Sequence, residues 1–170
     1  MEEILRDRNR QLEKTELIGL CRKDMELLSS YYQKEITAMH IAVRTSLPDN
    51  PLFIDGNAEQ LGKTIMSLLN NGMYAIAKKY GKKAYPAEIG LALESKDGQA
   101  VIRLYDNGVG IEQSILDKIF DPFFTTKTTG EAAGIGLYLS KEIILNHHGQ
   151  IAVRSEKDEL TEFTITLPLW

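Results

Sequence analysis

The strongest structural signal in the sequence is a run with helical periodicity between residues 58 and 79. Asn57 precedes the run and is a favourable N-cap residue, so we expect the helix to begin at Ala58. Apolar residues recur within the run at intervals of three and four, which places them on one helical face. They are Leu61, Ile65, Leu68, Leu69, Met73 and Ile76. A helix with one apolar face must pack on another layer of structure.

Several short strand patterns supply that layer. The expected strands are residues 41–43, 52–54, 88–93, 101–105, 150–155 and 162–167. Lys96-Asp97-Gly98-Gln99 is typical of a hairpin turn between two of them. A further helix is expected at residues 134–146. Helices combined with a largely antiparallel sheet predict an α+β fold, a two-layer α/β sandwich.

The beginning of the chain is predicted to form one helix over residues 3–34. Its apolar positions again follow three- and four-residue spacing. They are Leu17, Ile18, Cys21, Met25, Leu28, Tyr31 and Tyr32. The stretch before Leu17 is mostly charged, so that part of the helix needs a partner helix or lies in solvent.

Composition and charge exclude several classes of protein. A hydrophobic content of 43% with Cys 1, Gly 13 and Pro 5 excludes disordered, collagen-like and disulfide-rich chains. The formal net charge of −4 gives no basic surplus for nucleic acid or an anionic membrane. No apolar run approaches the ~20 residues that cross a bilayer. Because Cys21 cannot form an internal disulfide and Met1-Glu2-Glu3 is no signal peptide, we expect a cytoplasmic domain, whose parent protein is free to carry a membrane anchor.

The segment from Gly56 to Thr64 resembles a phosphate-binding loop but fails the test of spacing. The motif has four residues between its two glycines, and here there are five. Its helix also begins at the lysine, whereas Leu61 and Ile65 already share one helical face here. Gly62 is therefore expected within a helix, on a polar surface.

Three separated segments carry the functional signal. Residues 67–75 read Ser-Leu-Leu-Asn-Asn-Gly-Met-Tyr-Ala on the central helix, and residues 106–111 read Asp-Asn-Gly-Val-Gly-Ile directly after a strand. Residues 120–127 read Phe-Asp-Pro-Phe-Phe-Thr-Thr-Lys and precede Gly134-Ile135-Gly136-Leu137 at a helix start. Each segment alone has an ordinary structural explanation, but their joint order does not. The irregular stretch 112–133 is typical of an active-site lid.

Together these segments resemble the catalytic, ATP-binding domain of sensor histidine kinases, within the family shared with type II topoisomerases and mismatch-repair ATPases. The resemblance covers about residues 50–168, and the phrase Asp121-Pro122-Phe123-Phe124-Thr125-Thr126-Lys127 is especially typical of the kinases. It implies a Bergerat-type sandwich that holds ATP between its helical layer and a flexible lid.

The resemblance also implies roles for individual residues. Asn71 is expected to coordinate Mg²⁺, and Asp106 to receive the adenine amino group. Lys127 and Ser67 are the expected catalytic positions. The expected ATP-binding residues are Asn71, Tyr74, Ala75, Lys78, Asp106, Gly108, Gly110, Ile111, Phe123, Thr125, Thr126, Gly134, Ile135, Gly136 and Leu137.

The chemistry of these residue types agrees with the implied roles. The Asn71 carbonyl is a hard neutral oxygen that suits Mg²⁺, and the Asp106 carboxylate accepts from an exocyclic amine. The helix beginning at Gly134 offers free N–H groups to phosphate. Lys127 on the lid can bring positive charge to the γ-phosphate. Ser67 departs from the family pattern, because kinases usually have Asn there and hydrolysing relatives have a general-base Glu.

A histidine kinase also needs an acceptor histidine, and none of the three present fits that role. His40 has no acidic neighbour and lies at the entry to a strand, while His147 and His148 lie at a turn. We therefore expect a catalytic fragment that follows the acceptor. Residues 1–36 resemble the second helix of a dimerisation and phosphoacceptor hairpin, and residues 37–170 form the ATP-binding domain.

The function expected from the sequence is transfer of the ATP γ-phosphoryl group to a histidine outside this chain, in two-component signal transduction. The expected partners are the acceptor hairpin of a parent homodimer and a response regulator. Two alternatives stay open at this point. One is a Ser/Thr protein kinase of the anti-sigma-factor type, and the other is a nucleotide-binding module without phosphotransfer, which Ser67 makes conceivable.

Overall fold

A computed structural model of the chain describes residues 12–122, 124 and 135–170. Its elements in chain order are β1 (Glu13–Glu16), α2 (Leu17–Tyr31), α3 (Gln33–Ala38), β2 (Ala42–Ser46), β3 (Phe53–Gly56), α4 (Ala58–Tyr80), β4 (Glu88–Lys96), β5 (Gln99–Asp106), the 3₁₀-helix η1 (Gln113–Lys118), α5 (Ile135–Asn146), β6 (Gln150–Glu156) and β7 (Leu160–Pro168). No described helix is both long and apolar enough to cross a membrane.

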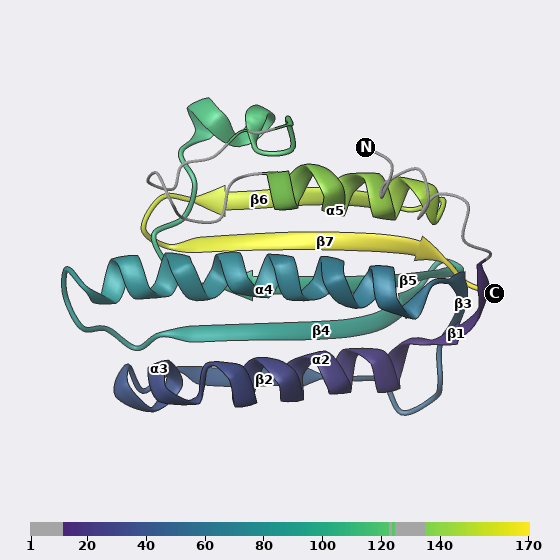
Figure 1. Cartoon of the computed structure of the whole chain (residues 1–170), viewed down its shortest axis with the longest axis horizontal. Helices are drawn as coiled ribbons and strands as arrows, with labels where there is room; N and C mark the ends of the chain where they lie inside the picture. The colour runs from purple at the N-terminus through teal and green to yellow at the C-terminus, as the bar shows by residue number, and fades with distance from the viewer. Residues whose placement is uncertain (1–11, 123, 125–134) are drawn as a thin grey trace.

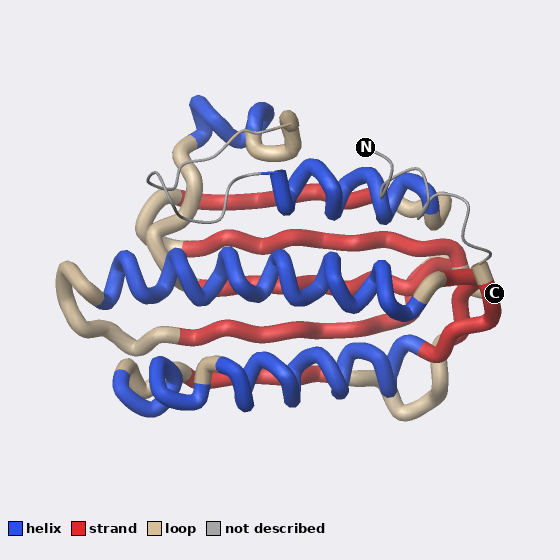
Figure 2. Tube along the Cα trace, viewed as in Figure 1, coloured by secondary structure: helices blue, strands red, loops and turns tan. Residues whose placement is uncertain are grey.

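The elements form two layers. Figure 1 shows α2, α4 and α5 side by side in front of a five-stranded sheet of order β2-β4-β5-β7-β6. Figure 2 shows the same arrangement, with the helices in blue before the strands in red. The sheet is antiparallel except for the β2–β4 pair, which is parallel. The predicted α+β two-layer sandwich is therefore confirmed.

The core lies between the two layers. Inward side chains alternate with half-exposed ones along β7 and along the second half of β5, as expected for a sheet with one covered face. The largest fully buried side chains come from both layers. They are Leu17, Leu28, Ile54, Ile65, Leu69, Ile76, Ile89, Leu91, Ile102, Ile144, Ile165 and Leu167.

Helix α4 is the central element of the helical layer, and it begins where the sequence predicts. The Asn57 side chain accepts a hydrogen bond of 3.0 Å from the Gln60 backbone N–H, which satisfies one of the free donors of the first turn. Gly62 lies inside the helix, so its N–H is not available to a phosphate. The rejection of a phosphate-binding loop is therefore confirmed.

The predicted helix over residues 3–34 is wrong over part of its length. Residues 13–16 form strand β1, which pairs antiparallel with β3, and the helix begins only at Leu17. Glu16 caps it, since its carboxylate accepts from the N–H groups of Ile18 at 2.6 Å and Gly19 at 2.9 Å. Tyr31 was expected on the apolar face but is 76% exposed. Residues 3–11 lie outside the described residues.

Helix α2 belongs to the helical layer and contributes Leu17, Cys21 and Leu28 to the common core. Tyr32, directly after α2, donates a hydrogen bond of 2.7 Å from its hydroxyl to Oδ1 of Asn70 on α4. The assignment of residues 1–36 to an acceptor hairpin stays a prediction.

Strand β3 joins the two ends of the described chain. It pairs with β1, and the Phe53 carbonyl accepts a hydrogen bond of 2.8 Å from the Trp170 backbone N–H. The Lys14 ammonium lies over both rings, 4.6 Å from the centroid of Phe53 and 3.9 Å from that of Trp170. Cation–π contacts of this kind stabilise the corner.

His147 connects the end of α5 to the start of α4. It is buried, and its Nε2 accepts a hydrogen bond of 3.0 Å from the Asn57 backbone N–H, while Nδ1 lies 2.8 Å from the Ile143 carbonyl. Both contacts are satisfied by one neutral tautomer, and burial lowers the pKa of His147 below its usual value. The predicted structural role of His147 at this turn is confirmed.

Replacing His147 by alanine should destabilise the fold by about 1–3 kcal/mol at pH 7.5, because the Asn57 N–H loses its partner. The folded state favours the neutral ring, so this stability is present above the usual histidine pKa of about 6.5 and is lost as pH falls below it. Urea unfolding at pH 7.5 and pH 5.5 measures both effects. The exposed neighbour His148, with a φ of 60°, provides a control as His148→Asn. An equal loss in both variants would contradict the prediction.

Candidate functional site

One cavity of about 470 Å³ opens between the C-terminal half of α4 and the loops at that end of the sheet. Its walls come from α4, the segment after β5, η1, the start of α5 and the turn between β6 and β7. The lining residues are Asn71, Tyr74, Ala75, Lys78, Lys82, Asp106, Val109, Gly110, Ile111, Glu112, Ile115, Ile119, Phe124, Leu137, Lys157, Asp158, Thr161 and Phe163.

Helix α4 presents one continuous face to this cavity. Asn71, Tyr74, Ala75 and Lys78 are spaced by three and four residues, and all four line it. Ser67 is half-buried one turn before Asn71 and is not among the lining residues. The face predicted from spacing therefore lines a cavity, without Ser67.

Asp106 is the most deeply buried ionisable group at the cavity, at 5% exposure. It ends strand β5, and its Oδ1 accepts a hydrogen bond of 2.9 Å from the Gly108 N–H. Burial raises the pKa of Asp106 to about 7, although the Gly108 N–H and the charge of Lys79 act in the opposite direction. A carboxylate held in this way can accept a hydrogen bond from an amine inside the cavity.

The segment after Asp106 passes unusually close to other backbone. A Cβ on Gly108 would lie 2.5 Å from the Ala75 carbonyl carbon, so only glycine fits there. Val109 follows, and its N–H donates a 3.2 Å hydrogen bond to the Ala75 carbonyl. Gly110 has a φ of 71°, and a Cβ there would clash with the Glu156 carbonyl oxygen. Gly108 and Gly110 thus allow close approach to the backbone of Ala75 and Glu156, whereas their role in binding ATP stays a prediction.

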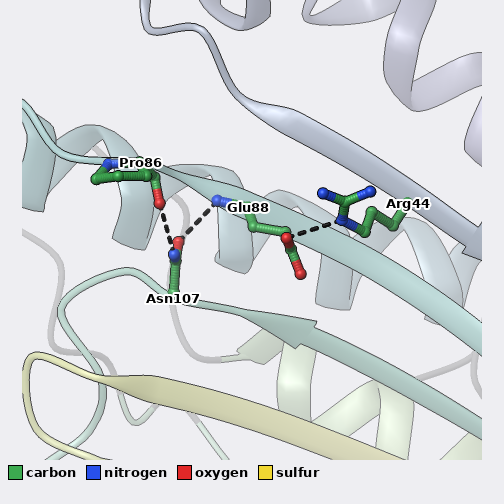
Figure 3. Close-up of polar contacts among 4 residues, drawn as sticks. All are labelled: Arg44, Pro86, Glu88 and Asn107. Carbon is green, nitrogen blue, oxygen red and sulfur yellow. Dashed lines mark hydrogen bonds and ion pairs between the residues drawn. The ribbon is translucent and has the colours of Figure 1, made fainter.

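Asn107 fixes the same segment from the side of β4, as Figure 3 shows. Its Oδ1 accepts a hydrogen bond of 2.8 Å from the Glu88 backbone N–H, and its Nδ2 donates one of 2.8 Å to the Pro86 carbonyl. The Glu88 side chain in turn forms an ion pair of 2.9 Å with Arg44. Residues on β2 and β4 therefore support the segment that follows Asp106.

The predicted site did not include several of the cavity residues, among them those of the β6–β7 turn. Lys157 and Asp158 reach the cavity from that turn, and Lys157 pairs with Glu112 at 3.0 Å. The Asp158 N–H donates a 2.6 Å hydrogen bond to the Val109 carbonyl. No local pattern in residues 157–161 signals this contact, because it depends on the pairing of distant strands.

The structure leaves part of the predicted site untested. Phe123, Thr125, Thr126, Lys127 and Gly134 lie outside the described residues. Ile135 and Gly136 begin α5, and their surroundings are also outside what the structure describes. Leu137 and Ile111 line the cavity as predicted residues.

The residues at the cavity fit a magnesium ion held largely by a nucleotide. Asn71 supplies a neutral oxygen donor at the wall, and the described residues contain no cluster of three His, Cys, Asp or Glu side chains that could hold a metal. Mg²⁺ commonly takes one or two protein ligands and completes its shell with phosphate and water. Asn71 would thus be the protein ligand.

If Asp106 receives an adenine amino group, as the resemblance implies, binding of ATP should depend on pH. An amine donor favours the carboxylate, and the fraction of carboxylate rises as pH passes the Asp106 pKa of about 7. We expect ATP affinity to rise by up to about tenfold between pH 6 and pH 8. Calorimetry measures this dependence. Since the ATP phosphates also titrate, Asp106→Asn is the control, and an equal dependence in both proteins would contradict the prediction.

A family model described as "Histidine kinase-, DNA gyrase B-, and HSP90-like ATPase" matches residues 56–170. The chain belongs to this family. The ATPase domain is 34% identical over 123 residues to Sporulation kinase D of Bacillus subtilis (strain 168). This match covers 72% of this chain and 22% of the relative. It is 39% identical over 122 residues to Signal transduction histidine-protein kinase AtoS of Escherichia coli (strain K12), covering 71% and 19% respectively. The chain thus spans about a fifth of these relatives.

Solved structures agree on the fold of the ATPase domain. The catalytic domain of histidine kinase ThkA superposes with a TM-score of 0.74 at 22% identity, covering 94% of this chain and 96% of that one. Full-length ShkA, solved with AMPPNP, gives 0.74 at 20% identity and covers 93% and 31%. The chain is a catalytic ATPase domain of the sensor histidine kinase type, as predicted.

Proposed function

We propose that the ATPase domain transfers the γ-phosphoryl group of Mg²⁺–ATP to a histidine that lies outside this chain. The observation that carries the proposal is Asp106, a buried carboxylate at the wall of a cavity that the Asn71 face of α4 also lines. Its environment suits recognition of the adenine amino group. The likeness to named histidine kinases supports the choice of acceptor.

The proposed roles follow from position and chemistry. Asp106 receives the adenine amine, and the backbone of Gly108 and Gly110 borders the base. Asn71 holds Mg²⁺, which offsets the charge of the phosphates. Lys127 is proposed to approach the γ-phosphate from the lid. Transfer would then rest on positioning and electrostatics, since little covalent chemistry falls to the protein.

The histidines of the chain support an external acceptor. His40 is exposed in a turn between α3 and β2, with a φ of 51°, and His147 is buried with both ring nitrogens in contact. His148 is exposed at the turn after α5. None of the three lies within a helix of the structure. We therefore propose that a parent homodimer supplies the acceptor hairpin and that a response regulator receives the phosphoryl group afterwards.

Ser67 favours a second candidate, a domain that binds nucleotide without transfer. Its hydroxyl is a poor base at neutral pH, and it stands where hydrolysing relatives carry Glu. We expect the chain alone to hydrolyse ATP slowly. The Ser/Thr kinase alternative has no structural observation in its favour.

Radiolabelled ATP tests the proposal, first with the chain alone and then with the acceptor hairpin of the parent protein added. We expect no labelling alone and weak labelling of the hairpin, because covalent linkage no longer raises the effective concentration. The label should be acid-labile, as phosphohistidine is.

The other outcomes of this experiment are equally informative. Acid-stable label would identify a Ser/Thr kinase, and an absence of label a binding module. Strong labelling of His40, His147 or His148 in the chain alone would overturn the proposal. Rapid phosphate release that survives Asn71→Ala would place the activity outside this cavity.

A further inference from the structure

Lys79 lies next to the cavity face of α4 and makes contacts that the proposed binding residues do not account for. Its Nζ donates a hydrogen bond of 3.2 Å to the Asn107 carbonyl and one of 2.6 Å to the Asp158 carbonyl. The same ammonium lies 4.4 Å from the centroid of the Tyr85 ring. One side chain thus joins the segment after β5, the β6–β7 turn and the loop before β4.

These contacts close a network around the backbone that follows Asp106. Asp158, held by Lys79 through its carbonyl, donates its own N–H to the Val109 carbonyl at 2.6 Å. Val109 donates in turn to the Ala75 carbonyl on α4. Lys79 therefore binds one carbonyl on each of two chain segments, Asn107 on the segment after β5 and Asp158 on the β6–β7 turn, and these segments meet at Val109. Without the ammonium, two carbonyls would lose a charged donor at that point.

The charge of Lys79 also acts on the groups around it. It lowers the pKa of Asp106 against the larger effect of burial. It also lowers the pKa of Glu159 on the β6–β7 turn, against the stronger upward effect of Glu156. The ionisable residues of the cavity lining besides Asp106 are Tyr74, Lys78, Lys82, Glu112, Lys157 and Asp158, and Tyr85 lies beside the Lys79 ammonium.

We propose that Lys79 is a positioning residue for base recognition, because it ties the backbone of residues 107–110 to the β6–β7 turn and so fixes the edge of the cavity beside Asp106. Lys79 itself is not among the residues that line the cavity. This inference rests on the proposed adenine-binding role of Asp106, and it assigns base selectivity to a residue outside the cavity lining.

The test compares three ligands, ATP, GTP and inorganic tripolyphosphate, by calorimetry with Mg²⁺ present. Lys79→Met should weaken ATP binding by about tenfold, which corresponds to loss of roughly one charge-assisted hydrogen bond. GTP and tripolyphosphate should weaken no more than in Lys83→Met, a matched variant that removes a nearby exposed positive charge. The ratio of ATP to GTP affinity should therefore fall only in Lys79→Met.

Two results would overturn the inference. One is ATP affinity in Lys79→Met within twofold of Lys83→Met. The other is loss of tripolyphosphate binding equal to the loss of ATP binding, since Lys79 would then act on the phosphates. If Lys79→Met does not fold, Lys79→Ala removes the same donor and suits a helix, and an unchanged ATP to GTP ratio in that variant would also overturn the inference.

Asp106→Asn, measured in the same series, separates this inference from the proposed function. If Asp106→Asn binds ATP as tightly as the wild type, the adenine site itself is wrong. The other result is that Asp106→Asn binds ATP more weakly while Lys79→Met keeps its ATP affinity and its ATP to GTP ratio. That result would support the adenine site and contradict only the proposed role of Lys79.

Discussion

Asp106→Asn should lower ATP affinity by about 10- to 100-fold at pH 8, equivalent to about 1.4–3 kcal/mol. The wild-type carboxylate offers only acceptors at that pH, whereas an asparagine amide presents an acceptor on one side and a donor on the other. The Gly108 N–H occupies one oxygen, so the amide donor would face the adenine amine. Calorimetric titration with ATP measures the loss.

The same substitution should not weaken the fold. A buried carboxylate with a raised pKa makes the folded state less favourable as pH rises through about 7, and a neutral amide removes that cost. Thermal unfolding should therefore show Asp106→Asn at least as stable as the wild type at pH 8. Asp97→Asn in the exposed β4–β5 turn is the matched control, and wild-type ATP affinity in both variants would exclude the adenine site.

Gly110→Ala should destabilise the domain by about 3 kcal/mol or more, the second large effect that we expect. Two costs combine there, because the residue has a φ of 71° and a Cβ would clash with the Glu156 carbonyl oxygen. A left-handed conformation alone costs an alanine about 1–2 kcal/mol. Displacing fixed backbone costs about 1–3 kcal/mol in addition.

Gly98→Ala isolates the first of these costs. Gly98 has a φ of 76° in the β4–β5 turn, but a Cβ there would meet no atom within 4 Å. Urea unfolding should place its loss at about 1–2 kcal/mol, below that of Gly110→Ala. Equal losses in the two variants would contradict the prediction. They would show that the backbone at Glu156 moves away from a Cβ at residue 110 at little cost, so that the close approach of Gly110 to Glu156 does not fix the shape of the cavity.

The elements that the sequence predicts well are those determined by interactions between residues close together in the chain. Helix α4 begins at the expected cap, because Asn57 and the apolar spacing act within a few residues of each other. The β4–β5 turn also lies where expected, and its two central residues, Asp97 and Gly98, both have positive φ. That conformation is the one that Asp-Gly favours in two-residue hairpins.

The elements that the sequence misses have distant causes. Strand β1 has no apolar residue, and it forms because Glu13 to Glu16 pair with β3, with Glu13 opposite Gly56. The helical spacing of apolar residues from Leu17 onward led to the prediction of a single helix that included residues 13–16. Lys79 and Asp158 likewise acquire their places only when the β6–β7 turn meets the segment after β5. The resemblance to the histidine kinases pointed to Asp106, Gly108 and Gly110, whereas the residues that hold them in position carry no motif.

Strands β1 and β3 and Trp170 meet at one end of the described chain, beside the start of α4. The cavity lies along the second half of the same helix, so the two features are separated by most of the length of α4. From Ala58 to Lys78 the helix spans about 30 Å. A rotation of about 20° of the rigid domain about that corner would move the cavity end of the helix by about 10 Å. A small change of angle at the β1–β3 corner is therefore a large displacement of the cavity.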